Sequence, residues 1–101
     1  MNWHKNMYFG EEARKKKTKI IYNIDTHKLQ FGVYVLTFAA NGTDLIDIIP
    51  SFMLEKEGYK GRDIVVIGLA ASKDEAYEVG RQIITDVYEQ TGGFDVRSYF
   101  A

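Results

Sequence analysis

The fold is decided by two apolar stretches, FGVYVLTFAA at residues 31–40 and IVVIGLAA at residues 64–71. Each is followed at once by residues that start helices, NGTD at 41–44 and SKDE at 72–75. Apolar runs without polar alternation are typical of strands covered on both faces, and a helix directly after a strand is typical of a parallel crossover. The sequence therefore predicts a small α/β domain of order α-β-α-β-α with a short, mainly parallel sheet.

The chain has 101 residues, of which 46% are hydrophobic, and it carries no cysteine. This length suits one hydrophobic core, so we expect a single domain over residues 1–101, with a less ordered N-terminus over residues 1–10. The lack of cysteine excludes thiol nucleophiles, disulfides and thiolate metal sites. Because no stretch has the apolar character of a signal peptide or a membrane span, we expect a cytoplasmic protein with no membrane partner.

Three helices are expected around the two strands. Residues 11–24 are rich in helix formers, although a strand at residues 19–24 is the alternative. A second helix would begin at Thr43, and Pro50 would kink it or end it. The last helix begins with a capping box, Ser72 and Glu75, continues at helical spacing to residue 91, and has Gly80 on its inner face.

A ligand site is expected where the two strands end. Open α/β sheets bind ligands outside the carboxyl ends of their strands, and two helix N-termini there would suit a phosphate or a carboxylate. The candidate ligand-binding residues are Asn41, Gly42, Thr43, Ser72 and Asp74. The alternative is that Thr43 and Ser72 are ordinary helix caps, because acidic side chains in the same first turns would repel an anion.

A run of basic residues forms a second candidate binding surface. Thirteen basic and fourteen acidic side chains give a net charge of −1, so only a local patch could attract a nucleic acid. The candidate nucleic-acid-binding residues crowd the first predicted helix: Arg14, Lys15, Lys16, Lys17 and Lys19. The same residues would also form an ordinary solvated helix face.

The sequence shows no recognisable catalytic pattern. The two histidines, His4 and His27, lack serine or carboxylate partners at a recognisable triad spacing, and we expect both to be solvated. We predict no catalytic residue, no metal site and no cofactor.

Association with another protein is the function that these patterns favour. Two strands alone leave unpaired backbone on both flanks, which a third strand at residues 94–100 or a partner subunit could cover. We therefore expect a non-catalytic interaction domain, a homodimer being one form of it. Nucleic-acid binding through the basic helix and ligand binding or catalysis at the strand ends are the alternatives.

Overall fold

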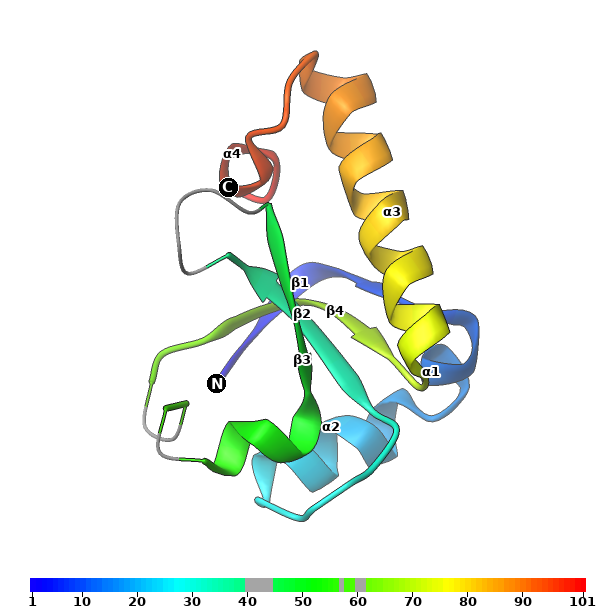
Figure 1. The fold of residues 1–101 in the computed structure, drawn as a ribbon, viewed down its shortest axis with the longest axis vertical. Coiled ribbons are helices and arrows are strands. Elements are labelled where there is room, and N and C mark those ends of the chain that lie inside the picture. The colour runs from blue at the N-terminus through cyan, green and yellow to red at the C-terminus, as the bar shows by residue number, and fades with distance from the viewer. Residues whose placement is uncertain (40–44, 57, 60–61) are drawn as a thin grey trace.

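The computed structural model describes residues 1–39, 45–56, 58–59 and 62–101. Figure 1 shows a twisted sheet crossing the middle of the molecule, with the longest helix along one side and two helices at one end. The elements in chain order are β1 (Asn2–Phe9), α1 (Glu11–Lys15), α2 (Lys17–Asp25), β2 (Tyr34–Phe38), β3 (Ile46–Pro50), the 3₁₀-helix η1 (Ser51–Glu55), β4 (Val65–Ala70), α3 (Lys73–Thr91) and α4 (Val96–Tyr99).

The sheet is mixed, with strand order β1-β4-β2-β3. β1 runs parallel to β4, whereas β2 runs antiparallel to both β4 and β3. The predicted mixture of helices and strands is thus confirmed, but the prediction of a mainly parallel sheet is wrong. The reason is that β3 follows β2 in the element order and pairs antiparallel with it, so a strand of the same sheet lies between the two apolar stretches. A strand buried on both faces is apolar whichever way its neighbour runs.

The segment predicted to be the middle helix forms β3 and η1 instead. Three isoleucines in five residues favour a strand, because β-branched side chains pack well on a pleated surface. Pro50 neither kinks nor ends a helix; it ends β3, and the 3₁₀-helix follows it. The helical spacing of the apolar residues therefore predicts the wrong element here, and the β-branched composition agrees with the observed strand.

Both ends of the chain also differ from expectation. Residues 2–9, predicted to be less ordered, form β1 and pair with β4. The C-terminal segment is not a third strand: Asp95 caps the short helix α4 by accepting a hydrogen bond from the Ser98 backbone N–H at 3.2 Å. The helix predicted over residues 11–24 is confirmed rather than the alternative strand, although Lys16 divides it into α1 and α2.

Two hydrophobic clusters lie on opposite faces of the sheet. Val35 and Leu36 are neighbours on β2, so their side chains point to opposite faces, and each belongs to a different cluster. The cluster around Val35 includes residues of α1, α2 and η1, and the cluster around Leu36 includes residues of α3 and α4. Within the described parts of the chain, no helix has the length and apolarity needed to cross a membrane.

The ends of α3 are confirmed in detail. The Ser72 side chain accepts a hydrogen bond from the Glu75 backbone N–H, and Gly92 closes the helix with a positive φ of 75°. The helix packs tightly on the sheet at Gly68 of β4, where an added Cβ would lie 3.1 Å from Val79 Cγ1. At Gly80, an added Cβ would meet Leu36 Cδ2 at 3.5 Å, which is ordinary van der Waals contact.

Gly80→Ala is therefore expected to stabilise the protein by about 0.5–1 kcal/mol. Alanine favours the helix and restricts the unfolded chain, and the site has room for its methyl group. Urea unfolding followed by circular dichroism measures the change. A loss of stability would show instead that α3 needs a glycine here to approach Leu36.

Candidate functional site

The carboxyl ends of the two parallel strands form one candidate site. β1 ends at Phe9 and β4 at Ala70, and α1 and α3 begin close to these ends. A recess of about 430 Å³ lies here, lined by Tyr8, Phe9, Gly10, Glu11, Asp74, Glu75, Glu78, Val79 and Gln82. Four of these nine residues are acidic, so the surroundings disfavour an anionic ligand.

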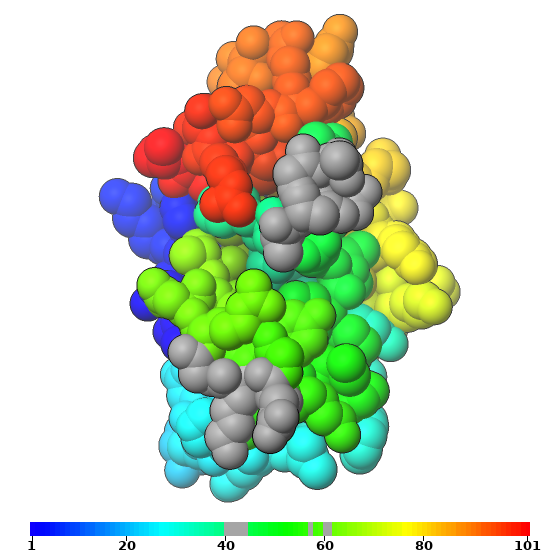
Figure 2. Space-filling model, turned by 60° about the vertical axis from the view of Figure 1, so that its left-hand side comes forward, coloured from blue at the N-terminus to red at the C-terminus, as the bar shows by residue number. Residues whose placement is uncertain are grey.

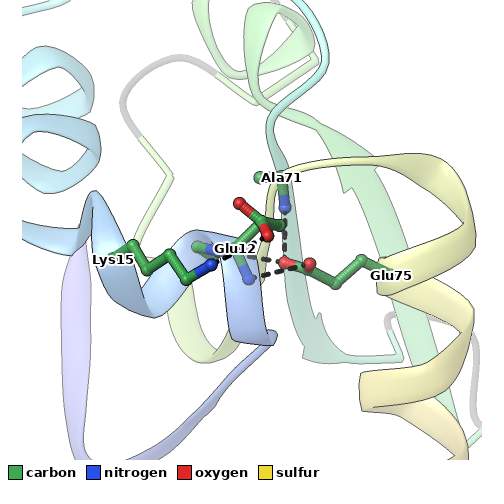
Figure 3. A network of polar contacts seen from close by, with 5 residues as sticks. Glu12, Lys15, Ala71 and Glu75 are labelled. Carbon is green, nitrogen blue, oxygen red and sulfur yellow. Dashed lines mark hydrogen bonds and ion pairs between the residues drawn. The ribbon is translucent and has the colours of Figure 1, made fainter.

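Glu75 occupies the place that an anion would take. Its Oε1 accepts hydrogen bonds from the backbone N–H groups of Ala71 at 2.9 Å and Ala13 at 3.1 Å. Its Oε2 accepts a hydrogen bond from the Glu12 N–H at 3.0 Å (Figure 3). One carboxylate of α3 thus binds the free amides at the start of α1 and at the end of β4. Gly10 makes this possible, because a Cβ there would collide with the Glu75 carboxylate.

The predicted strand-end residues are only partly placed by the structure. Ser72 is the N-cap of α3, and Asp74 lies in the first turn of α3 and lines the recess. Asn41, Gly42 and Thr43 lie outside the described residues. The prediction that the two loops share one edge assumed parallel strands, yet Ala70 pairs with Tyr34 at the start of β2, and β2 ends at Phe38. The ends of β2 and β4 therefore lie at opposite ends of the sheet.

The predicted basic surface lies on α1, on α2 and on Lys16 between them, and all five side chains are exposed. The Phe9 ring is contacted by two of them, with Arg14 Cζ at 5.2 Å and Lys17 Nζ at 5.4 Å from its centroid. Lys15 forms an ion pair with Glu12 at 3.2 Å. The neighbouring acidic residues Glu11 and Glu12 share α1 with this surface, so the positive patch is local.

A second recess, of about 380 Å³, lies beside the end of β2 and the start of β4 (Figure 2). Arg97 packs over the Phe38 ring at 4.8 Å and donates a hydrogen bond to the Ala39 carbonyl. Arg62 packs over the Tyr59 ring at 5.9 Å. Asp63 also lines this recess and accepts a hydrogen bond from the Asn2 side chain at 2.6 Å. Local sequence patterns do not reveal these residues as a group, because they come together from distant segments.

A polar cluster joins β1 to the C-terminal half of the chain. The Tyr8 hydroxyl donates a hydrogen bond to Asp86 Oδ2 at 2.6 Å and lies 2.8 Å from the Tyr99 hydroxyl. His4 belongs to the same region: its Nε2 bonds to the Phe100 carbonyl at 2.7 Å, and its Nδ1 accepts from the Asn6 N–H. The expectation that His4 is solvated is therefore wrong. Among the described residues, no group of three or more His, Cys, Asp or Glu side chains could hold a metal ion.

Partial burial and the hydrogen bond to Asp86 raise the pKa of Tyr8 well above its ordinary value near 10. The unfolded chain releases the Tyr8 proton near that ordinary value, whereas the folded protein keeps it to a higher pH. The stability that this hydrogen bond contributes is thus complete below about pH 10 and declines as the pH rises further. We expect the free energy of unfolding to fall more steeply above this pH in the natural protein than in Tyr8→Phe, as measured by urea unfolding at a series of pH values. Parallel curves for the two proteins would contradict the prediction.

The outer edge of the described sheet, at β3, forms a third candidate site. The Ser51 backbone N–H donates to the Val33 carbonyl at 2.8 Å, and the β2–β3 register continues as Val35↔Ile49 and Thr37↔Asp47. Hydrogen-bonded pairs alternate along an antiparallel ladder, so the odd-numbered residues of β3 bond to β2. The backbone groups of Ile46, Ile48 and Pro50 therefore point away from the sheet. Over the described ranges, no backbone group pairs with them.

An apolar groove of about 340 Å³ runs beside this edge, between β3 and α3. Its lining is Leu45, Ile46, Ile48, Tyr77, Gly80, Arg81 and Ile84. The Tyr77 side chain is 56% exposed although it is largely apolar. The Arg81 guanidinium is already paired with Glu78 at 2.8 Å. The groove therefore presents mainly aliphatic and aromatic surface next to β3 backbone that no described strand pairs with.

No family model, no curated protein and no solved structure matched this chain in the comparisons.

Proposed function

We propose that this protein is a non-catalytic interaction module that binds an extended segment of a protein chain along β3. The observation that carries the proposal is the pairing of two features at one place. The outward N–H groups of Ile46 and Ile48 offer hydrogen bonds to an added strand, and the groove beside them accepts apolar side chains. An added strand places alternate side chains on one face, so every second residue would enter the groove.

The character of the groove favours a polypeptide over the alternatives. A nucleic acid needs cations, and the one cation along the described lining, Arg81, is paired with Glu78. At the recess beside the strand ends, the amides that would bind an anionic ligand are bonded to Glu75. These contacts support edge pairing as the first function to test.

The test is selection of binders from a displayed library of short random peptides, with the protein immobilised so sparsely that copies cannot meet. We expect enriched peptides to carry apolar residues at alternate positions and to shift the amide signals of Ile46 and Ile48 in NMR spectra. Ile48→Pro removes an outward N–H while leaving the hydrogen bonds to β2, and it should abolish binding. Ile48→Ala is the matched control, because it shortens the same side chain and keeps the N–H.

Two outcomes would contradict the proposal. One is the absence of any enriched peptide, and the other is a set of binders that shift signals away from β3. Steeply salt-dependent binding of duplex or single-stranded nucleic acid, lost on changing Arg14, Lys16 and Lys17 together, would favour the nucleic-acid alternative instead.

A further inference from the structure

We infer that the segment bound at β3 is the β3 strand of a second copy of this chain, paired antiparallel about a two-fold axis at Ile48. This inference rests on the proposed function, since it names the occupant of the same edge. Two copies joined in this way would share one continuous sheet. Isologous pairing requires a strand that is complementary to itself, and β3 meets this requirement in its hydrogen bonds and its side chains.

The backbone of β3 can make four hydrogen bonds to its own copy. With the axis at Ile48, the two Ile48 residues exchange both of their N–H···O=C bonds. Ile46 lies opposite the partner's Pro50 and donates its N–H to the partner's Pro50 carbonyl, and the symmetric bond forms as well. Pro50 has no N–H, but in this register it is needed only as an acceptor.

Neighbouring registers are less favourable. With the axis at Asp47, the two Asp47 residues would form a non-hydrogen-bonded pair, in which opposite side chains lie closest together. Two like charges in such a pair are destabilising. With the axis at Ile49, each Ile48 would lie opposite the partner's Pro50, and Ile46 would lie beyond the end of the partner's β3. Only two hydrogen bonds would then form instead of four. The charge of Asp47 and the missing N–H of Pro50 therefore both favour the register centred on Ile48.

The side chains on the α3 face fit the same arrangement. Ile46 and Ile48 pack against the Leu36 cluster, on the face covered by α3. The two-fold axis places the Ile48 side chains of both copies next to each other at the mouths of the two grooves. The grooves would then close into one apolar interior, covering Leu45, Ile84 and the exposed ring of Tyr77. Burial of this surface supplies the hydrophobic part of the association.

The experiment combines sedimentation equilibrium of the full chain with hydrogen exchange, each over about a hundredfold range of concentration. We expect a reversible monomer–dimer equilibrium, with exchange at the Ile46 and Ile48 amides slowing as the dimer forms. Ile48→Pro should be monomeric, and Ile48→Ala should dimerise more weakly than the natural protein. Circular dichroism establishes that each variant is folded. If Ile48→Pro does not fold, Ile46→Lys replaces it, because the charge would have no partner in the closed interior.

The outcomes separate this inference from the proposed function. A chain that stays monomeric at every concentration, yet binds peptides at β3, overturns the dimer and leaves the edge function standing. A chain that neither dimerises nor binds peptides overturns both. A dimer that persists in Ile48→Pro and Ile46→Lys, with no protection at Ile46 and Ile48, places self-association elsewhere and also overturns the inference.

Discussion

Replacing Glu75 with alanine is expected to lower the free energy of unfolding by about 3 kcal/mol, because three backbone N–H groups lose a charged acceptor at once. The donors belong to Glu12, Ala13 and Ala71, so the loss would separate the start of α1 from the start of α3. Ala13 is fully buried in the natural protein, so leaving its amide without the carboxylate acceptor is costly. Urea unfolding measures the effect.

Glu78→Ala is the matched control for this prediction. Glu78 lies one turn further along α3, and its ion pair with Arg81 is on the surface. Its removal should change stability little, since exposed pairs of this kind contribute little. A similar loss in both variants would show that the general helix content of α3, rather than the contacts of Glu75, determines the result.

Gly10→Ala offers an independent test of the same contacts. Its Cβ would displace the Glu75 carboxylate, so we expect a loss close to that of Glu75→Ala. Because both substitutions break the same hydrogen bonds, the double variant should be little worse than either single variant. Additive losses would indicate that Gly10 and Glu75 act separately.

Gly68→Val is expected to destabilise the protein by about 3 kcal/mol through overpacking. Even the first added carbon would lie 3.1 Å from Val79 Cγ1 and 3.2 Å from Leu36 Cβ. Leu36 is fully buried, and Val79 is 5% exposed, so neither has free space into which to move. The valine methyl groups would force α3 away from the sheet. Thermal and urea unfolding give the loss of stability.

A second substitution tests whether contact with Val79 causes this loss of stability. Val79→Ala removes the Cγ1 atom nearest to the new Cβ, so we expect Gly68→Ala to cost less in the Val79→Ala background than in the natural protein. An equal cost in both backgrounds would place the strain at Leu36 or in the β4 backbone.

Much of the local structure was predictable from nearby residues. The Ser72 and Glu75 pair begins α3, and the glycine at position 92 ends it, as expected. These features depend on residues within one or two helical turns of each other, which is the range over which capping acts. The same capping pattern pointed to Glu75, but only as a residue of its own helix. Its bonds to Glu12 and Ala13, more than sixty positions away along the chain, could not be predicted from helix capping.

The middle of the chain shows where local patterns mislead. Leu45, Ile48, Ile49, Phe52 and Met53 have a spacing that suits a helix, yet the first three belong to or adjoin a strand. The sequence predicts that Pro50 interrupts a helix, whereas in the structure its missing N–H suits the outer side of an end strand. The difference between helix and strand also decides the candidate interface, because only a strand places the backbone of Ile46 and Ile48 at the outer edge of the described sheet.

By itself, the sequence determined that this chain has buried strands at its two apolar stretches and a capped helix after the second. The burial of a strand and the capping of a helix depend on short segments of the chain, so the residues of those segments are enough to predict them. The tertiary structure alone decided that β2 runs antiparallel to β4, that β1 completes the sheet, and that Glu75 joins two helices. Strand direction depends on how the chain returns between segments, and an apolar strand covered on both faces has the same composition whichever way its neighbour runs.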